Sequence, residues 1–131
     1  MDELDWYTVT FSPEPRSVGR VRAHVAGLCA SLGIDGDGPI TAISELAANA
    51  VEYAGGHGDF TVAARQRAGM LWIVVSDRLP CTIPLVDDVD PLADSGRGLL
   101  MARSVSAAFA FGLWERGKSI AVGFPLAGAS S

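Results

Sequence analysis

Cysteine, positive charge and long apolar runs are all scarce in this sequence. Only two cysteines occur among 131 residues, Cys29 and Cys81, and they stand too far apart for a disulfide framework or a metal knuckle. His24 and His57 show no metal-ligand spacing with these cysteines. We therefore expect a reduced, cytoplasmic protein.

Basic residues are outnumbered by acidic ones. Lysine and arginine together number 10, against 15 aspartates and glutamates, which leaves a formal net charge of -5. No cluster of basic residues interrupts this acidic balance, whereas a general nucleic-acid binder shows a basic face. We therefore expect no direct contact with nucleic acid.

No uncharged apolar run approaches the roughly 20 residues that cross a bilayer. The first residues, MDELDWYTVTF, do not place a basic segment before an apolar one, so no secretory signal is expected. Neither an internal repeat nor a low-complexity linker divides the chain. With 49% hydrophobic and 8% aromatic residues, the sequence predicts one globular domain over residues 1–131, with a loose tail at 127–131.

The spacing of the apolar residues predicts the order of the elements. Helical spacing is found at residues 18–32, where Gly33 follows, and from the cap-like Asp37 to about residue 54. A third helix is expected to begin at Gly98. The predicted strands cover residues 6–11, 60–65, 71–76, 109–113 and 120–124.

This order of elements is typical of a two-layer α+β domain, in which helices pack on one face of a mixed, mostly antiparallel sheet. The strands at 60–65 and 71–76 form one predicted hairpin, and the last two strands form another around a turn at 115–118. Residues 78–95 contain three prolines and several aspartates, so we expect an irregular loop that acts as a lid.

The stretch SELAANAVEYAG, residues 44–55, places a carboxylate and a carboxamide four positions apart among small apolar residues. At about 100° per residue, Glu45, Asn49 and Glu52 lie opposite the apolar stripe of this helix. A solvated helix face is the simpler interpretation. Asparagine is mildly unfavourable inside a helix, however, and the flanking alanines leave room for a ligand to approach.

Two more places can carry chemistry. Asp77 ends the strand LWIVVSD, where a carboxylate can accept a hydrogen bond from a ligand amine, although aspartate also commonly starts a turn. In DSGRGLLMARS, residues 94–104, Gly96 and Gly98 let backbone N–H groups approach an anion at the start of a helix. A loop-to-helix junction that simply needs glycine is the alternative.

Taken in order, these features resemble one known family. A helical E-x-x-x-N, a strand ending in Asp, a long loop, S-G-R-G-L and a terminal G-K-S strand are similar to the small ATP-binding anti-sigma factor kinases of the GHKL (gyrase, heat-shock chaperone, histidine kinase, mismatch-repair) ATPase group. SELAANAVEYAG resembles the N-box of this family, VSDRLP its first glycine box and SGRGLLMARSV its second. The resemblance implies a Bergerat-type ATP-binding fold with ATP and Mg²⁺ as cofactors.

The resemblance also implies a role for each matching residue. Asn49 is the implied Mg²⁺ ligand, and Glu45, one turn earlier, is the implied general base that takes the proton of an attacking hydroxyl. Asp77 is implied to recognise the adenine amine, and Ser119, beside the usual threonine position of the family, to complete the adenine end. The residues implied to surround the phosphates are Gly96, Arg97, Gly98 and Leu99.

The sequence departs from the family pattern in the first glycine box. Leu79 and Cys81 stand where fuller members have glycines, and Tyr53 replaces a histidine that often follows the N-box. The expected lid is also acidic, which disfavours phosphate nearby unless these side chains point outward or help to hold Mg²⁺. Its aspartates are Asp87, Asp88, Asp90 and Asp94.

Two functions remain open on these grounds. The first is an anti-sigma factor with serine/threonine protein kinase activity, which phosphorylates an anti-sigma factor antagonist. The second is a non-catalytic partner-switching module of the same fold with weak or no nucleotide binding. An excised histidine kinase catalytic domain is less favoured, because the chain has no dimerisation helix with a suitable histidine.

The partners implied by the resemblance are a sigma factor, its antagonist and a second copy of the chain in a possible homodimer. A row of residues four apart on the first helix, Arg16, Arg20 and His24, lies off its apolar stripe. In the resembled family this end of the molecule contacts partner proteins, although most such rows are merely solvated.

Overall fold

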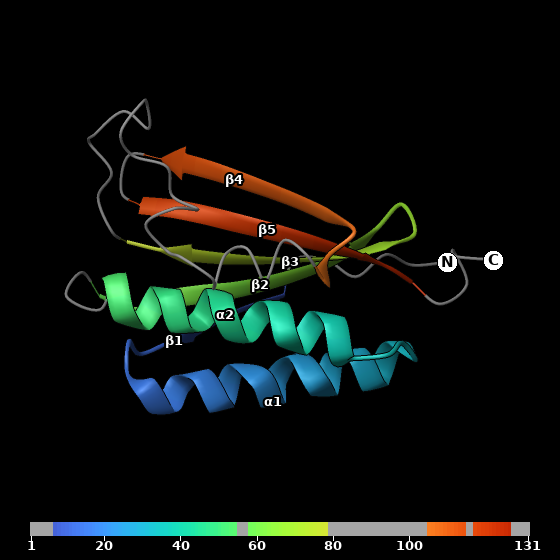
Figure 1. Cartoon of the computed structure of the whole chain (residues 1–131), viewed down its shortest axis with the longest axis horizontal. Helices are drawn as coiled ribbons and strands as arrows, with labels where there is room; N and C mark the ends of the chain where they lie inside the picture. The colour runs from blue at the N-terminus through green and yellow to red at the C-terminus, as the bar shows by residue number, and fades with distance from the viewer. Residues whose placement is uncertain (1–6, 55–57, 79–104, 115–116, 127–131) are drawn as a thin grey trace.

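The structure is a computed structural model, and it describes residues 7–54, 58–78, 105–114 and 117–126. Two helices and five strands make up the described part of the chain (Figure 1). Their bounds are β1 Tyr7–Phe11, α1 Pro15–Leu32, α2 Asp37–Ala54, β2 Phe60–Arg67, β3 Met70–Asp77, β4 Ala108–Trp114 and β5 Gly117–Pro125.

The strands form one sheet in the order β1-β2-β3-β5-β4. Each neighbouring pair is antiparallel, so the described sheet contains no parallel pair and is antiparallel rather than mixed. Both helices lie on the same side of the sheet (Figure 1). The predicted two-layer α+β architecture is therefore confirmed.

Helix α1 ends where the sequence predicts, at Leu32, but begins at Pro15, ahead of the predicted start at residue 18. Pro15 stands at its first turn, where a missing N–H costs nothing. Gly33 follows its last residue with φ 71°, the left-handed conformation that glycine adopts without a Cβ clash. The N–H groups of Gly33 and Ile34 donate to the carbonyls of Ala30 and Cys29, which satisfies the end of the helix.

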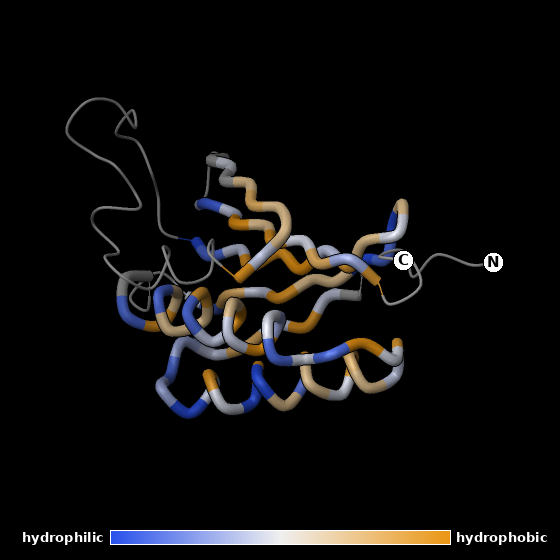
Figure 2. Tube along the Cα trace, turned by 45° about the vertical axis from the view of Figure 1, so that its right-hand side comes forward, coloured by the Kyte–Doolittle hydropathy of each residue, from blue (hydrophilic) through white to orange (hydrophobic). Residues whose placement is uncertain are grey.

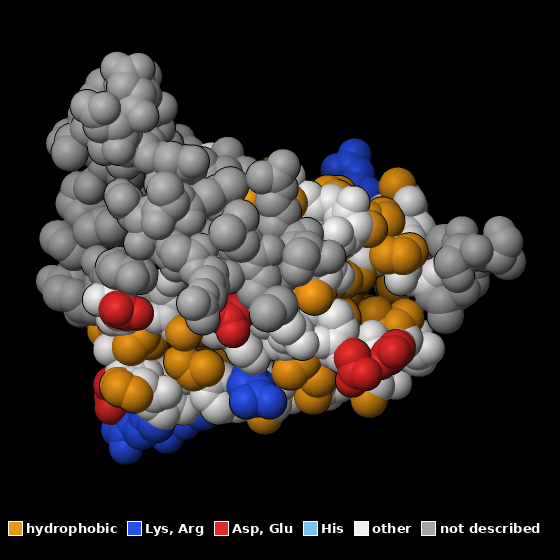
Figure 3. All heavy atoms as spheres, viewed as in Figure 1, with side chains coloured by type: hydrophobic (Ala, Val, Ile, Leu, Met, Phe, Trp, Pro, Cys, Tyr) orange, Lys and Arg blue, Asp and Glu red, His pale blue; other side chains and the backbone are white. Residues whose placement is uncertain are grey.

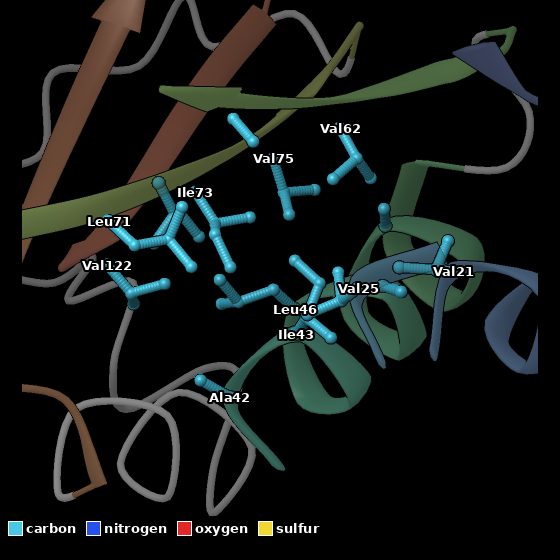
Figure 4. Close-up of a cluster of buried hydrophobic side chains, with 14 of the residues drawn as sticks. Val21, Val25, Ala42, Ile43, Leu46, Val62, Leu71, Ile73, Val75 and Val122 are labelled. Atoms are coloured by element: carbon cyan, nitrogen blue, oxygen red, sulfur yellow. The ribbon is translucent and has the colours of Figure 1, made fainter. Parts of the chain in front are cut away.

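The core lies between the helices and the sheet, as Figure 4 shows. Strand β3 alternates between buried and half-buried positions, so that Leu71, Ile73 and Val75 face the helices. Ile43 and Leu46 of α2 and Val21 and Val25 of α1 fill the opposite side, and each is at most 2% exposed. The trace of Figure 2 shows the same separation, with the central strands mainly hydrophobic and α1 alternating along its length.

The hairpins are tighter than the sequence predicts. Strands β2 and β3 extend to a two-residue turn, Ala68-Gly69, whose φ angles of 53° and 77° both lie in the left-handed region. In the second hairpin Trp114 pairs with Gly117, so Gly117 and Lys118 belong to β5 and not to the turn.

The expected lid and the expected third helix up to residue 104 lie outside the described residues. Within the described ranges, neither helix is long and apolar enough to cross a membrane.

Candidate functional site

Asn49 lies on α2 and is buried, with 8% of its surface exposed. The prediction that it faces away from the apolar stripe is therefore wrong. Asn49 stands two helical turns after the fully buried Ala42, so it lies along the edge of the buried face. Glu52 is exposed as predicted, and Glu45 is half-buried.

The Asn49 amide has an unmet hydrogen-bonding requirement. Its Nδ2 is buried and has no hydrogen-bond partner among the residues that the structure describes. A buried amide of this kind costs free energy, because it has lost water without gaining a partner. A buried amide nitrogen with no partner in the described part of the chain, beside a well-packed core, favours a ligand site at this place.

Asp77 is the second buried polar residue of the candidate site. It is the last residue of β3, and the alternation of the strand turns it to the helix-facing side, where it is 4% exposed. Its Oδ2 lies 2.7 Å from Nζ of Lys118, and both side chains are largely buried, with exposed fractions of 6% and 12%. The Asp77 carboxylate is therefore held in a buried ion pair.

Lys118 is a residue that the sequence reasoning did not single out. It stands directly opposite Asp77 in the register of β3 and β5. Side chains opposite each other in an antiparallel pair share one face of the sheet, so the register brings the two charges together. The pattern that could have found it is the alternation of Lys118 with Ile120, Val122 and Phe124, which face the core.

The backbone of β5 approaches β3 closely beside this ion pair. A Cβ on Gly117 would overlap the carbonyl oxygen of Asp77 and lie 2.9 Å from the Cα of Arg78. Only glycine allows the strands to meet in this way. Gly117 thus fixes the position of Lys118 relative to Asp77.

Ser119 is not brought together with Asp77. It pairs with Ser76 in the register, and their hydroxyl oxygens lie 2.7 Å apart. Alternation places these two serines on the face of the sheet opposite to Asp77 and Lys118. The side chain on the Asp77 face is therefore that of Lys118 and not that of Ser119.

The predicted phosphate-binding residues Gly96, Arg97, Gly98 and Leu99 lie outside the described residues, as do Leu79 and Cys81. Among the residues that are described, the topology gathers the predicted site at one end of the molecule. β3 ends and β5 begins at the same end at which α2 finishes (Figure 1). Asn49 and Asp77 are thus buried polar groups at the same end of the domain, on two elements that pack together.

The described residues could bind a magnesium ion only through a single side chain, with water and substrate phosphates as the other ligands. Within the described ranges, no group of three His, Cys, Asp or Glu side chains could form a metal cage. Mg²⁺ commonly keeps several waters and takes one or two protein ligands together with substrate phosphates. A single amide fits this mode, since rotation of the side chain by 180° about its last bond lets it present either its oxygen or its nitrogen.

The polar row on α1 is only partly solvated. Arg16 and Arg20 are exposed, and Arg16 pairs with Glu14 at 2.9 Å. His24 is half-buried, with its ring 6.3 Å from that of Phe11, and burial lowers its pKa. Figure 3 shows basic side chains over the first turns of α1 at the lower left, while the rest of the described face carries mixed types.

Neither the Cys29 thiol nor a hollow formed by described residues at the far end of β5 belongs to this site. Burial raises the pKa of Cys29, and the nearby Asp35 charge adds to this, so the thiol stays protonated. A hollow of about 430 Å³ lies at the other end of β5. It is lined by Gly33, Ile34, Asp35, Gly38, Pro39, Phe124, Pro125 and Leu126.

Comparisons with known proteins identify the fold. No known family model matches the sequence, and no curated protein matches it significantly. Among solved structures, the chain is similar to the crystal structure of the RsbU and RsbW domains of Rv1364c from Mycobacterium tuberculosis, with a TM-score of 0.70 and 23% sequence identity. The match covers 94% of this chain and 32% of that one.

This likeness supports the fold that the sequence resemblance predicts. Two helices pack on a five-stranded antiparallel sheet, in an α+β sandwich consistent with the Bergerat-type fold. The chain spans about one third of the length of the matched protein.

Proposed function

We propose that this protein is an ATP-binding anti-sigma factor with serine/threonine protein kinase activity. The observation that carries the proposal is the buried Asn49 amide, which has no hydrogen-bond partner among the described residues and stands on α2 of a Bergerat-type fold. The likeness to a structure that contains an RsbW domain supports the same function.

The proposed roles follow the chemistry of the described side chains. Asn49 would hold Mg²⁺, which neutralises phosphate charge when it is bound. Glu45 stands one helical turn earlier and is half-buried, so its carboxylate can accept a proton from a substrate hydroxyl. Asp77 would anchor the base, and Gly96, Arg97, Gly98 and Leu99 remain the proposed phosphate-binding residues.

The proposed protein substrate is an anti-sigma factor antagonist, and the proposed regulatory partner is a sigma factor. Phosphorylation of the antagonist would release it and leave this domain free to bind the sigma factor. These partners place the proposed activity in the cytoplasm. A homodimer and contacts through the exposed Arg16 and Arg20 are part of the same proposal.

The kinase proposal is tested by phosphoryl transfer from labelled Mg·ATP to a candidate antagonist. We expect transfer by the wild type, transfer slowed by about 100-fold or more in Glu45→Ala, because a general base contributes about that factor, and loss of Mg-dependent nucleotide binding in Asn49→Ala. Glu52→Ala is the matched control, since Glu52 lies on the same helix and is exposed. If the wild type binds ATP but transfers nothing to a cognate antagonist, the kinase activity is contradicted.

A second candidate, the non-catalytic partner-switching module, is favoured by the Asp77–Lys118 ion pair. The carboxylate proposed to anchor the base already accepts a charged donor at 2.7 Å. A base amine that replaced this donor is neutral, so its bond to the carboxylate would lose the attraction between two opposite charges. ATP binding without transfer, or regulation of the sigma factor in the absence of nucleotide, would support this candidate.

A further inference from the structure

The face of the sheet that points away from α1 and α2 is covered by no helix or strand of the described ranges. Both helices lie on the other side of the sheet (Figure 1). Leu71, Ile73 and Val75 of β3 point toward the helices (Figure 4), so Trp72 and Val74, which alternate with them, point away. We call this surface the outer face.

The outer face carries little charge. Its middle row across β2, β3 and β5 is small and apolar, and one flanking row carries three hydroxyl groups. The middle row is Ala63, Val74 and Ala121, and the hydroxyl row is Thr61, Ser76 and Ser119. No acidic residue points outward from a described strand, although the chain contains 15 acidic residues. The solvated face of an antiparallel sheet is usually polar, so a large surface of this kind indicates an interaction site.

The outer face is level enough to receive a second sheet. A Cβ on Gly123 would lie 3.0 Å from the Trp72 ring, so the indole lies against this glycine and does not stand out from the sheet. At about 4.8 Å between strands and about 3.4 Å per residue, five strands and the seven residues from Thr61 to Arg67 give a flat area of about 500 Å². The accessible area of side chains exceeds this flat area, and a stable interface uses about 600–1,000 Å² per partner.

The two rows that flank the middle row complement each other. The row opposite to the hydroxyl row contains Arg65 and Trp72, whose side chains donate hydrogen bonds. A two-fold axis along the middle row would exchange the flanking rows. Arg65 would then lie over Thr61 of the partner subunit, and Trp72 over Ser76 of the partner subunit. The hydroxyl oxygens of Ser76 and Ser119 lie 2.7 Å apart, and each oxygen can still accept a further hydrogen bond.

We propose that the outer face is a homodimer interface, in which two sheets stack face to face about this two-fold axis. The inference rests on the homodimer that is part of the proposed function and assigns its surface, but it does not depend on nucleotide binding or on kinase activity. A second copy pairs the donors of one flanking row with the acceptors of the other, twice. An unrelated apolar partner would bury these polar groups without such bonds, which costs free energy.

Like charges do not oppose this arrangement. The Arg65 side chains of the two copies would lie about 14 Å apart along the strands. This separation exceeds the Debye length of about 8 Å at physiological salt, so their repulsion is largely screened. The short side chains of the middle row also suit the spacing of about 10 Å between stacked sheets.

The interface is tested by sedimentation velocity of the whole chain over a concentration series, with circular dichroism to confirm that each variant folds. We expect the wild type to show a monomer–dimer equilibrium. In Ala63→Glu the two new carboxylates would face each other across the axis, so the dissociation constant of the dimer should rise by at least about tenfold. Ala23→Glu is the matched control, since Ala23 is exposed on α1, and it should leave this constant unchanged.

A variant that strengthens the dimer tests the pairing of the flanking rows. Thr61→Asp places a carboxylate where Arg65 of the partner subunit is expected, so the dimer should tighten by about fivefold, the upper end for an ion pair at a surface. Within one chain these two positions are about 14 Å apart on the strand, too far for an ion pair. The gain should therefore disappear when Thr61→Asp is combined with Arg65→Ala.

A wild type that stays monomeric at every concentration would overturn the inference. A dimer that Ala63→Glu leaves intact, or that Ala23→Glu disrupts, would overturn it as well, because the interface would then lie elsewhere. Weakening of the dimer by Thr61→Asp would contradict the two-fold pairing. ATP binding is measured on the same samples. A dimer that binds no ATP contradicts the proposed ATP-binding function and not the interface, whereas a monomer that binds ATP contradicts the interface alone.

Discussion

At the scale of single residues, the candidate site is defined by buried polar groups that the core does not need. Asn49 and Asp77 are two of only three polar or charged residues that are buried within the described ranges, the third being Ser17. Asp77 is paired with Lys118, whereas the Asn49 amide has no partner among the described residues. Burying an amide without a partner costs free energy, and a role in binding a ligand would explain why the residue is there.

Replacing Asn49 by leucine should stabilise the protein while abolishing its proposed function. Asn49→Leu removes a buried amide that lacks a partner and adds apolar contact at the edge of the core. We expect the free energy of unfolding to rise by about 1 kcal/mol, measured by urea denaturation. Ala48→Leu, on the exposed side of the same helix, is the control and should change stability little. A marked loss of stability in Asn49→Leu would show that the amide supports the fold itself.

The sequence indicates which residue types matter but not all of their surroundings. The N-box pattern singles out Glu45 and Asn49, and the end of a strand singles out Asp77. The burial of Asn49 was missed, because an apolar stripe drawn on a helix does not show how far the neighbouring elements extend around it. Lys118 was missed for a different reason, because its partner is 41 residues away in the chain and depends on strand register.

At the scale of elements, the register between β3 and β5 decides which side chains lie at the site. A shift of one residue in this register would turn Lys118 to the other face and bring Ser119 to Asp77. The sequence predicts both strands from their alternation, but the pairing of β5 between β3 and β4 follows only from the packed sheet. The residue beside Asp77 on this face of the sheet is therefore Lys118, and not Ser119 as the sequence predicts.

Gly117 is expected to be essential for the close pairing of β3 and β5. In Gly117→Ala the new Cβ would overlap the Asp77 carbonyl, so β5 must move away from β3 and the ion pair must separate. We expect a loss of about 2–3 kcal/mol in the free energy of unfolding, at the upper end of the usual range for single substitutions.

Gly112→Ala provides the matched comparison for this effect. Gly112 lies in the neighbouring strand of the same hairpin, and its added Cβ would come no closer than 4.0 Å to the Ser119 carbonyl. Its unfolding free energy should fall by much less than that of Gly117→Ala in the same denaturant series. Equal effects of the two substitutions would contradict the proposed role of Gly117.

At the scale of the whole molecule, the fold follows closely from the sequence. Both helices, both hairpins and the two-layer arrangement agree with the spacing of apolar residues, because amphipathic helices and alternating strands have few ways to share one core. The likeness to the structure with RsbU and RsbW domains rests on this arrangement. What the described fold adds is that α2 finishes at the end where β3 ends and β5 begins (Figure 1), which places the buried Asn49 and Asp77 at the same end of the domain.

The central claim is that a nucleotide binds at this end with a divalent cation held by Asn49. Its most direct test is calorimetric titration of the wild type and Asn49→Ala with ATP, each with Mg²⁺ and with EDTA. We expect the wild type to bind ATP at least about tenfold more tightly with Mg²⁺, which corresponds to about 1.4 kcal/mol, and Asn49→Ala to bind equally in both buffers. A wild type that binds no ATP, or an Asn49→Ala variant with an unchanged response to Mg²⁺, would contradict the claim.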